Sequence, residues 1–326
     1  MDERLRAHLL AYEPADEAFV DGVFRFVLRR DPDDAARARA LEKLADGTIS
    51  RATLLRELVT SGEFERIRLL DDAVALAAGA RSRGERLRRL EGPPATDERV
   101  IEIPWVLSRL RAGRVLEIGY AFAEPAYLAG LVAAHVGDLL GADLAEGEVP
   151  GMTTVVADVR ALPYADGELD QVLLVSTLEH VGADNERYGV RGAGDRRAIG
   201  EALREIRRVL KPDGSLLVTV PVGEPEDYGW FRQDTVRGWT HQFVRARFFV
   251  EELEVYELRD DGWRASPTFD GAGVRYGERG PAASAVLCAE LSPRRARRLA
   301  SVDGLVRTAR RRGAPTWRRV RPAPEN

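Results

Sequence analysis

The chain has 326 residues, enough for a main domain of about 200 residues beside a smaller one. A composition of 44% hydrophobic and 31% charged residues excludes a disordered or collagen-like chain. The single cysteine, Cys288, excludes an internal disulfide and favours a reducing compartment such as the cytoplasm. No run of about 18 apolar residues occurs and the first ten residues are charged, so we expect neither a membrane-spanning helix nor a signal peptide.

Charge is unevenly distributed along the chain. Residues 291–326 hold eleven arginines and two acidic residues, which gives this tail a net charge of +9. Since the whole chain has a net charge of −4, residues 1–290 have a net charge of −13. A partial helical stripe of apolar residues runs through this basic C-terminal tail. Two interpretations follow, a peripheral contact with the inner face of the membrane or a solvated tail. Arginines without aromatic side chains that stack on bases do not predict a nucleic-acid partner.

The N-terminal part predicts a small all-α module. In residues 16–66 apolar residues recur at helical spacing, Asp31-Pro32 interrupts the pattern, and Ser50 is a good N-cap for the helix that follows. The stretch from FVDGVFRFVLRRDPD to SGEF resembles the DUF4214 module, which accompanies bacterial glycan-related proteins and implies a packing or docking unit. A charged helix over 67–92, followed by Gly92-Pro93-Pro94, predicts a domain boundary between 92 and 93.

From Arg114 onward, short strand-like runs alternate with helical stretches. The runs are RVLEIG, DLLGAD, MTTVVAD, LDQVLLVS and GSLLVTVP, and RRAIGEALREIRRVL is one of the helices between them. Such hydrophobic strands are typical of a parallel sheet covered on both faces. We therefore predict an α/β fold over residues 93–290, a doubly wound and mostly parallel sheet with its ligand at the carboxyl ends of the strands. Cys288 is expected in a late, antiparallel strand, with its thiol in the core.

Acidic side chains mark the ends of these runs. Glu117 lies in the first run, Asp143 ends the second and Asp158 ends the third, and the fourth run leads into STLEHV at 176–181. Asp143 lies 24 residues beyond Gly119, a spacing at which a carboxylate accepts hydrogen bonds from ribose hydroxyls in nucleotide-binding α/β folds. Each carboxylate alone could be a surface or helix-capping group, but their joint order favours a ligand site.

Two long stretches carry a family resemblance. VVADVRALPYADGELDQVLLVSTLEHV and ALREIRRVLKPDGSLLVTVP resemble the signatures of class I S-adenosylmethionine-dependent methyltransferases of the type 11 group. The resemblance implies a seven-stranded Rossmann-like methyltransferase fold and an enzyme whose cofactor is S-adenosylmethionine. It also implies that Lys211 to Gly214 form a turn into the fifth strand.

The resemblance assigns a role to each strand end at the methionine half of the cofactor. Gly119 would line the methionine part, and Glu117 would order the turn in which Gly119 lies. Ser176 and Thr177 would lie beside the sulfonium.

The nucleoside half has its own implied contacts. Asp143, followed by Leu144, would bind the ribose. Asp158 and Val159 would meet the adenine, with the Asp158 carboxylate accepting a hydrogen bond from the exocyclic amine.

The turn after the first strand departs from the family pattern. Tyr120, Ala121, Phe122 and Ala123 stand where small residues are usual, so Gly119 is the one glycine retained. Tyr120 and Ala121 would still contact the cofactor if the aromatic rings point away. Otherwise the bulk would weaken cofactor binding, and the chain would be a non-catalytic scaffold. A nicotinamide cofactor is disfavoured, because its pyrophosphate needs a G-x-G-x-x-G turn.

Methyl transfer to a hydroxyl needs alignment and a base. His180 follows the fourth strand, and the ordinary pKa of histidine, about 6.5, suits a base at neutral pH. The alternative role for His180 is to order its loop or the cofactor. His241 is a second candidate base, in an aromatic-rich segment over 224–241. No spacing of histidines and cysteine predicts a metal site.

The segments at 181–195 and 224–241 are expected to bind the acceptor. Tyr188 and Trp230 could stack on sugar rings, and Asp184, Asn185 and Arg232 could hydrogen-bond hydroxyls; the alternative is that the aromatics only seal the loop. These segments resemble those of bacterial methyltransferases of surface polysaccharide or glycolipid synthesis. That resemblance implies a cytoplasmic enzyme acting on a glycan or glycolipid precursor. The competing acceptor is a small molecule, a quinone or a secondary metabolite.

Overall fold

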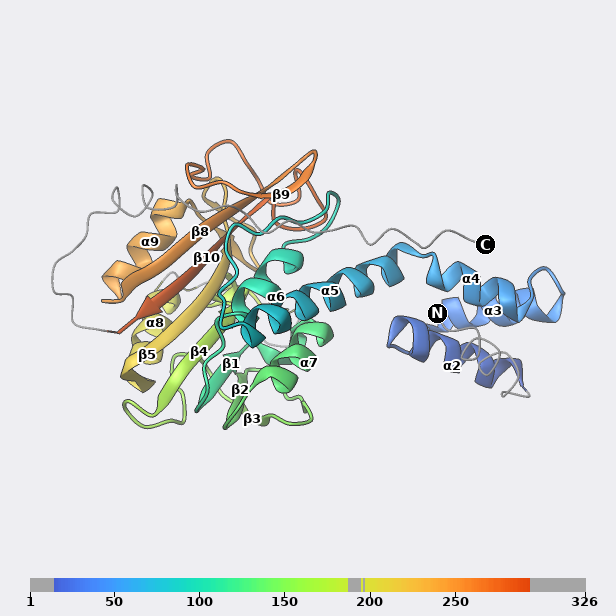
Figure 1. Cartoon of the computed structure of the whole chain (residues 1–326), viewed down its shortest axis with the longest axis horizontal. Helices are drawn as coiled ribbons and strands as arrows, with labels where there is room; N and C mark the ends of the chain where they lie inside the picture. Colours follow the sequence, from blue (N-terminus) through green and yellow to red (C-terminus); the bar gives the residue numbers. More distant parts are fainter. Residues whose placement is uncertain (1–14, 187–194, 196, 294–326) are drawn as a thin grey trace. The chain divides into compact units, whose positions relative to one another are not determined.

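The computed structural model describes residues 15–186, 195 and 197–293 (Figure 1), and the chain divides into two compact units between Asp72 and Ala73. None of the helices in these ranges is long and apolar enough to cross a membrane. The basic C-terminal tail lies outside the described residues from residue 294 onward.

The first unit is all-α, as predicted. It contains α2 (Asp16–Leu28), α3 (Asp34–Ala45), α4 (Arg51–Val59) and the beginning of α5 (Gly62–Ser82). Asp33 and Ser50 cap α3 and α4, because their side chains accept hydrogen bonds from backbone amides three residues on. The small core of this unit consists of Phe19, Val20, Val23, Phe24, Val27, Leu28, Ala40, Leu54, Leu55 and Leu58.

The second unit is built on an eight-stranded sheet in the order β3-β2-β1-β4-β5-β10-β8-β9. The first five strands of this order, β3 to β5, run parallel, and β10 is antiparallel to both of its neighbours. The predicted doubly wound, mostly parallel fold is therefore confirmed, as is the late antiparallel strand that holds the buried Cys288. The strands are β1 (Val115–Ile118), β2 (Leu139–Asp143), β3 (Thr153–Val156), β4 (Leu169–Val175), β5 (Leu210–Pro221), β8 (Phe249–Arg259), β9 (Gly262–Ala265) and β10 (Ala285–Ser292).

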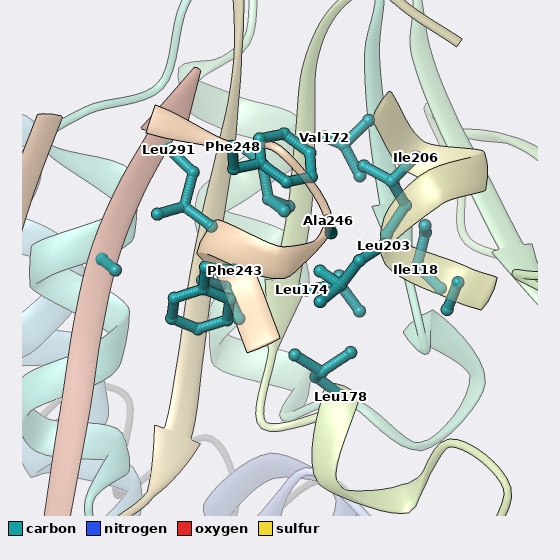
Figure 2. Close-up of a cluster of buried hydrophobic side chains, with 14 of the residues drawn as sticks. Ile118, Val172, Leu174, Leu178, Leu203, Ile206, Phe243, Ala246, Phe248 and Leu291 are labelled. Atoms are coloured by element: carbon teal, nitrogen blue, oxygen red, sulfur yellow. The ribbon is translucent and has the colours of Figure 1, made fainter. Parts of the chain in front are cut away.

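Helices cover both faces of this sheet. On one face α8 (Ala198–Val209) and α9 (Val236–Arg245) pack over side chains such as Ile118, Val172 and Leu174 (Figure 2). Successive side chains of a strand point to opposite faces, so Glu117 of β1 faces away from the side to which Ile118 points. The Glu117 carboxylate accepts a hydrogen bond from Tyr127 of α7 (Pro125–Ala134), and α7 therefore covers the other face of the sheet. Helix α6 (Arg99–Leu107) packs with α7 and β4.

Three details differ from the expectations. The sheet has eight strands rather than seven, because β9 forms a hairpin with β8 and extends the edge. Residues 211–214 form an irregularity inside β5 rather than a turn before it, since pairing with β4 passes from Leu210 to Ser215. The units divide before the predicted boundary between 92 and 93, because Leu87 and Leu90 are buried and bond Ser108 and Tyr256 of the second unit.

Candidate functional site

A cavity of about 200 Å³ opens at the carboxyl ends of β1, β2 and β4. This is the edge of a doubly wound sheet at which ligands are expected. Most of the strand-end residues singled out from the sequence line it, together with residues of α6 and α7. The lining residues that enter the argument below are Arg99, Gly119, Phe122, Asp143, Leu144, Asp158, Val159, Arg160, Ser176, Thr177, His180 and Asn185.

The turn after β1 keeps the backbone open to a ligand. Gly119 has φ of 94°, and a Cβ there would lie 2.5 Å from Oγ1 of Thr177, so another residue type would be both strained and obstructed. Residues Tyr120–Phe122 then form one short 3-10 turn, η1. The ring of Tyr120 is buried, its hydroxyl donates to the carbonyl oxygen of Gly147 over 2.9 Å, and it is not a cavity residue. The bulk at this position therefore points away from the cavity.

Asp143 ends β2 with a carboxylate held by main-chain donors. Its Oδ2 accepts from the amide of Ala121 and its Oδ1 from the amide of Ala145, both over 3.0 Å. Ala121 itself does not line the cavity, so it acts on the site through this bond. A carboxylate oxygen can accept more than one hydrogen bond, so the fixed carboxylate retains capacity for ribose hydroxyls.

Asp158, two residues beyond β3, is paired with Arg160. The carboxylate accepts from the Arg160 amide over 2.8 Å and from Nη2 over 2.6 Å. This side-chain bond to the arginine lowers the pKa of Asp158, so the group is ionised at neutral pH. Both residues, with Val159, line the cavity. The exocyclic amine of an adenine would thus meet the ionised carboxylate of Asp158, which is paired with Arg160.

Ser176 and Thr177 continue the wall from β4. Ser176 has φ of 44°, which residues with a side chain rarely adopt, and its amide donates to Oγ1 of Thr219 over 3.0 Å. The hydroxyl of Thr177 donates to the carbonyl oxygen of Val175 over 3.0 Å. Both residues therefore face the cavity in fixed orientations beside Gly119.

Behind this wall lies a group of buried carboxyls around one guanidinium. Burial raises the pKa of Glu117 and of Glu179 well above the ordinary value, although Tyr127 donates to Glu117 over 2.6 Å. Arg99 is paired with the fully buried Glu102 and also lines the cavity. Arg99 is thus a basic group that the site can present to an anionic part of a ligand.

His180 lies in the short turn η2 (Leu178–His180), at the cavity wall. Its Nδ1 is 2.8 Å from the carbonyl oxygen of Trp230. A carbonyl oxygen can only accept, so Nδ1 carries the proton and the lone pair of the neutral ring is on Nε2. The side chain of Asn185 donates to the carbonyl oxygen of His180 over 3.0 Å, which ties the next loop to this turn.

The predicted acceptor residues are divided by the structure. Asn185 lines the cavity, whereas Asp184, Trp230, Arg232 and His241 do not. His241 is exposed on α9, and Arg232 is paired with Asp227. Tyr188 lies outside the described residues. The acceptor roles of all these residues stay predictions.

Several cavity residues were missed from the sequence, and three of them enter the argument. Arg99 precedes the strand pattern, in a helix with an internal proline that periodicity does not reveal. Arg160 follows Asp158 directly, and its opposite charge was a signal for the ion pair. The sequence shows the bulk of Phe122 but does not indicate that this side chain faces the cavity while Tyr120 is buried.

Comparison with protein families agrees with this geometry. Residues 125–218 match the family model described as "Methyltransferase domain". This stretch is a methyltransferase domain. The cofactor expected for the domain, S-adenosylmethionine, is confirmed with it, and residues 7–67 match the domain of unknown function DUF4214. Both resemblances expected from the sequence are therefore confirmed.

Individual relatives of the methyltransferase domain are distant. A tRNA (carboxymethyluridine(34)-5-O)-methyltransferase of Arabidopsis thaliana is 32% identical over 77 residues, which are 24% of this chain and 16% of that protein. A solved methyltransferase of Thermotoga maritima is 19% identical, with a TM-score of 0.39 over 59% of this chain and 87% of its own. The [4+2]-cyclase SpnF is 17% identical, with a TM-score of 0.42 over 70% of this chain and 96% of its own.

The residues of the cavity fit this cofactor. A Cβ at Gly119 would fill the place beside Thr177, so the backbone leaves room for a close ligand, and Asp143 supplies an oriented acceptor for ribose. Arg99 supplies a cation for a carboxylate and Asp158 an acceptor for an amine. Within the ranges that the structure describes, no group of three His, Cys, Asp or Glu side chains could hold a metal ion.

Proposed function

We propose that this chain transfers the methyl group of S-adenosylmethionine to a hydroxyl of an acceptor, with His180 as the base. The observation that carries the proposal is that His180 and Asp143, within the stretch that matches a methyltransferase domain, line one cavity together with Gly119. Of the two bulky residues in the turn after β1, Tyr120 is buried away from the cavity and so does not obstruct it.

The chain's own residues supply alignment and a proton acceptor. When bound, the cofactor provides an electrophilic methyl group on a sulfonium. The carboxylates of Asp143 and Asp158 would hold the nucleoside half, and Arg99 would pair with the amino-acid carboxylate, since all three residues line the cavity. Nε2 of His180 takes the proton of the acceptor hydroxyl as its oxygen bonds to the methyl carbon. A bound methyl donor would keep the electron pair of the broken bond on its sulfur, so charge and atoms would balance.

A bacterial surface glycan or glycolipid precursor is the acceptor we favour. The support is the DUF4214 module together with the aromatic segment whose Trp230 carbonyl orients His180. By its name the Arabidopsis thaliana relative methylates an oxygen of carboxymethyluridine in tRNA. The alternative acceptors are a quinone or another small metabolite.

Calorimetric titration with S-adenosylhomocysteine tests the cofactor site. We expect micromolar binding, which is roughly 8 kcal/mol of affinity, and its loss in Asp143→Ala. Asp184→Ala is the matched control, since that carboxylate does not line the cavity. Absence of binding by the wild-type protein would refute the proposal and favour a non-catalytic scaffold.

Label transfer from radioactive S-adenosylmethionine in fractionated lysate tests the acceptor. Label in lipid-linked glycan supports the favoured class. Label confined to small extractable metabolites, or to tRNA, would overturn that class while leaving methyl transfer in place.

A further inference from the structure

Phe122 is a large apolar side chain at the mouth of the cavity. It lines the cavity and is 57% exposed, although a phenylalanine in water gives up the free energy that burial would gain. The position is one at which the sequence departs from the glycine-rich pattern of its family. The side chain is therefore a feature of this chain that the proposed function does not explain.

The turn that carries Phe122 is fixed from behind. The amide of Ala123 donates to the carbonyl oxygen of Tyr120 over 3.1 Å and closes the turn. The ring of Tyr120 packs on Gly141 of β2, where a Cβ would lie 2.8 Å from the ring, and its hydroxyl bonds Gly147. Because Tyr120 is held in this way, the direction of Phe122 toward the cavity is set by the fold.

The same turn is tied to the ribose-binding carboxylate. The amide of Ala121, the residue before Phe122, donates to Asp143. Leu144 follows Asp143, lines the cavity and is 43% exposed. Phe122 thus follows Ala121 in the chain and Leu144 follows Asp143, and the hydrogen bond joins Ala121 to Asp143. Two exposed apolar side chains beside a carboxylate match a ligand that is apolar on its faces and carries hydroxyls, which is the chemistry of a nucleoside.

We propose that Phe122 covers the nucleoside half of the bound cofactor and excludes water from it. This inference rests on the proposed function, because the cofactor is the occupant. A ring that loses its contact with water when the ligand binds favours the bound state in proportion to the area covered. His180, the proposed base, and Asn185 line the same cavity, so contact between Phe122 and the acceptor is the competing outcome.

Two ligands distinguish the halves of the cofactor. S-adenosylhomocysteine contains both halves, whereas 5′-methylthioadenosine lacks the amino-acid part. In Phe122→Ala we expect the dissociation constants of both ligands to rise by the same factor, about five- to tenfold. In Phe122→Leu we expect a rise of about twofold, since leucine retains most of the apolar area. Phe26→Ala is the matched control, because Phe26 is 46% exposed on α2 of the first unit. It should bind both ligands as the wild type does.

Several results would overturn the inference. Unchanged affinity of Phe122→Ala for both ligands would show that Phe122 does not cover the nucleoside. If the KM for the acceptor then rises in this variant, Phe122 contacts the acceptor instead. A loss confined to S-adenosylhomocysteine would place Phe122 at the methionine half. Failure of the wild-type protein to bind either ligand would instead count against the proposed function, so the two failures differ. Melting temperatures of the variants identify any loss that comes from unfolding.

Discussion

The hydroxyl of Ser176 donates to Oε1 of Glu102 over 2.7 Å, which joins the end of β4 to a fully buried carboxyl of α6. The other oxygen of this carboxyl accepts from Arg99. Since the φ of Ser176 is 44°, the bond stabilises a conformation that the residue would not adopt alone. Glu102 thus fixes two residues of the cavity wall.

Replacing Glu102 by glutamine should therefore destabilise the second unit. The amide can still accept from Ser176, but Arg99 loses the charge of its partner, and we expect the free energy of unfolding to fall by about 2 kcal/mol. Ser176→Ala removes one neutral donor to the carboxyl and should cost about 1 kcal/mol. Urea denaturation measures both. Equal stability of Glu102→Gln and wild type would contradict this account of the ion pair.

Replacing His180 by asparagine should lower kcat about 100-fold or more. The affinity for S-adenosylhomocysteine should stay within about twofold of the wild-type value, because a general base acts on the acceptor and not on the cofactor. His241→Asn is the control, since His241 is exposed and does not line the cavity. Retained activity in His180→Asn would assign His180 an ordering role.

The stability of the protein should decrease as the pH rises from about 4.5 to 7. Burial raises the pKa of Glu98 from 4.5 to about 7, so in this range the folded state binds more protons than the unfolded state. The contribution is fully present below pH 4.5, is lost as the pH approaches 7, and amounts to at most about 3 kcal/mol. Burial raises the pKa of Glu117 and Glu179 as well, which adds to the same trend.

Urea denaturation at several pH values tests this trend. Glu98→Gln should show a shallower decline than the wild type, since a glutamine can still accept the hydrogen bond from the amide of Ala283 but does not titrate. Parallel curves for the two proteins would show that Glu98 titrates normally in the folded state.

Replacing Gly119 by alanine should abolish tight cofactor binding. The variant has both a strained φ of 94° and a Cβ 2.5 Å from Oγ1 of Thr177, so either the turn or Thr177 must shift. Gly47→Ala separates the two effects, because Gly47 has φ of 74° with nothing within 4 Å of the added Cβ. Both variants should lose about 1 kcal/mol of stability from the backbone, and Gly119→Ala alone should bind S-adenosylhomocysteine at least about tenfold more weakly. Wild-type affinity in Gly119→Ala would show that the close approach is not needed.

The positions of Asp143, Ser176 and Thr177 could be predicted because strand ends in a parallel sheet converge on one edge, so order in the sequence becomes proximity in space. Arg99 could not, because its approach to the cavity depends on how α6 packs against β4 and α7. The direction of Tyr120 depends on Gly141 and Gly147, which leave room for its ring. The sequence draws attention to the ring of Trp230, yet its hydrogen bond to His180 comes from its carbonyl oxygen, which no side-chain pattern encodes.

The position of β10 has a consequence for the order in which the sheet is completed during synthesis. Of the described strands β10 comes last in the chain, yet it lies between β5 and β8. β8 and β9 therefore leave the ribosome before the strand that joins them to the rest of the sheet exists. Until Ala285–Ser292 follows, the edge of β5 that β10 will cover is open, and an open strand edge is a surface on which another chain can pair.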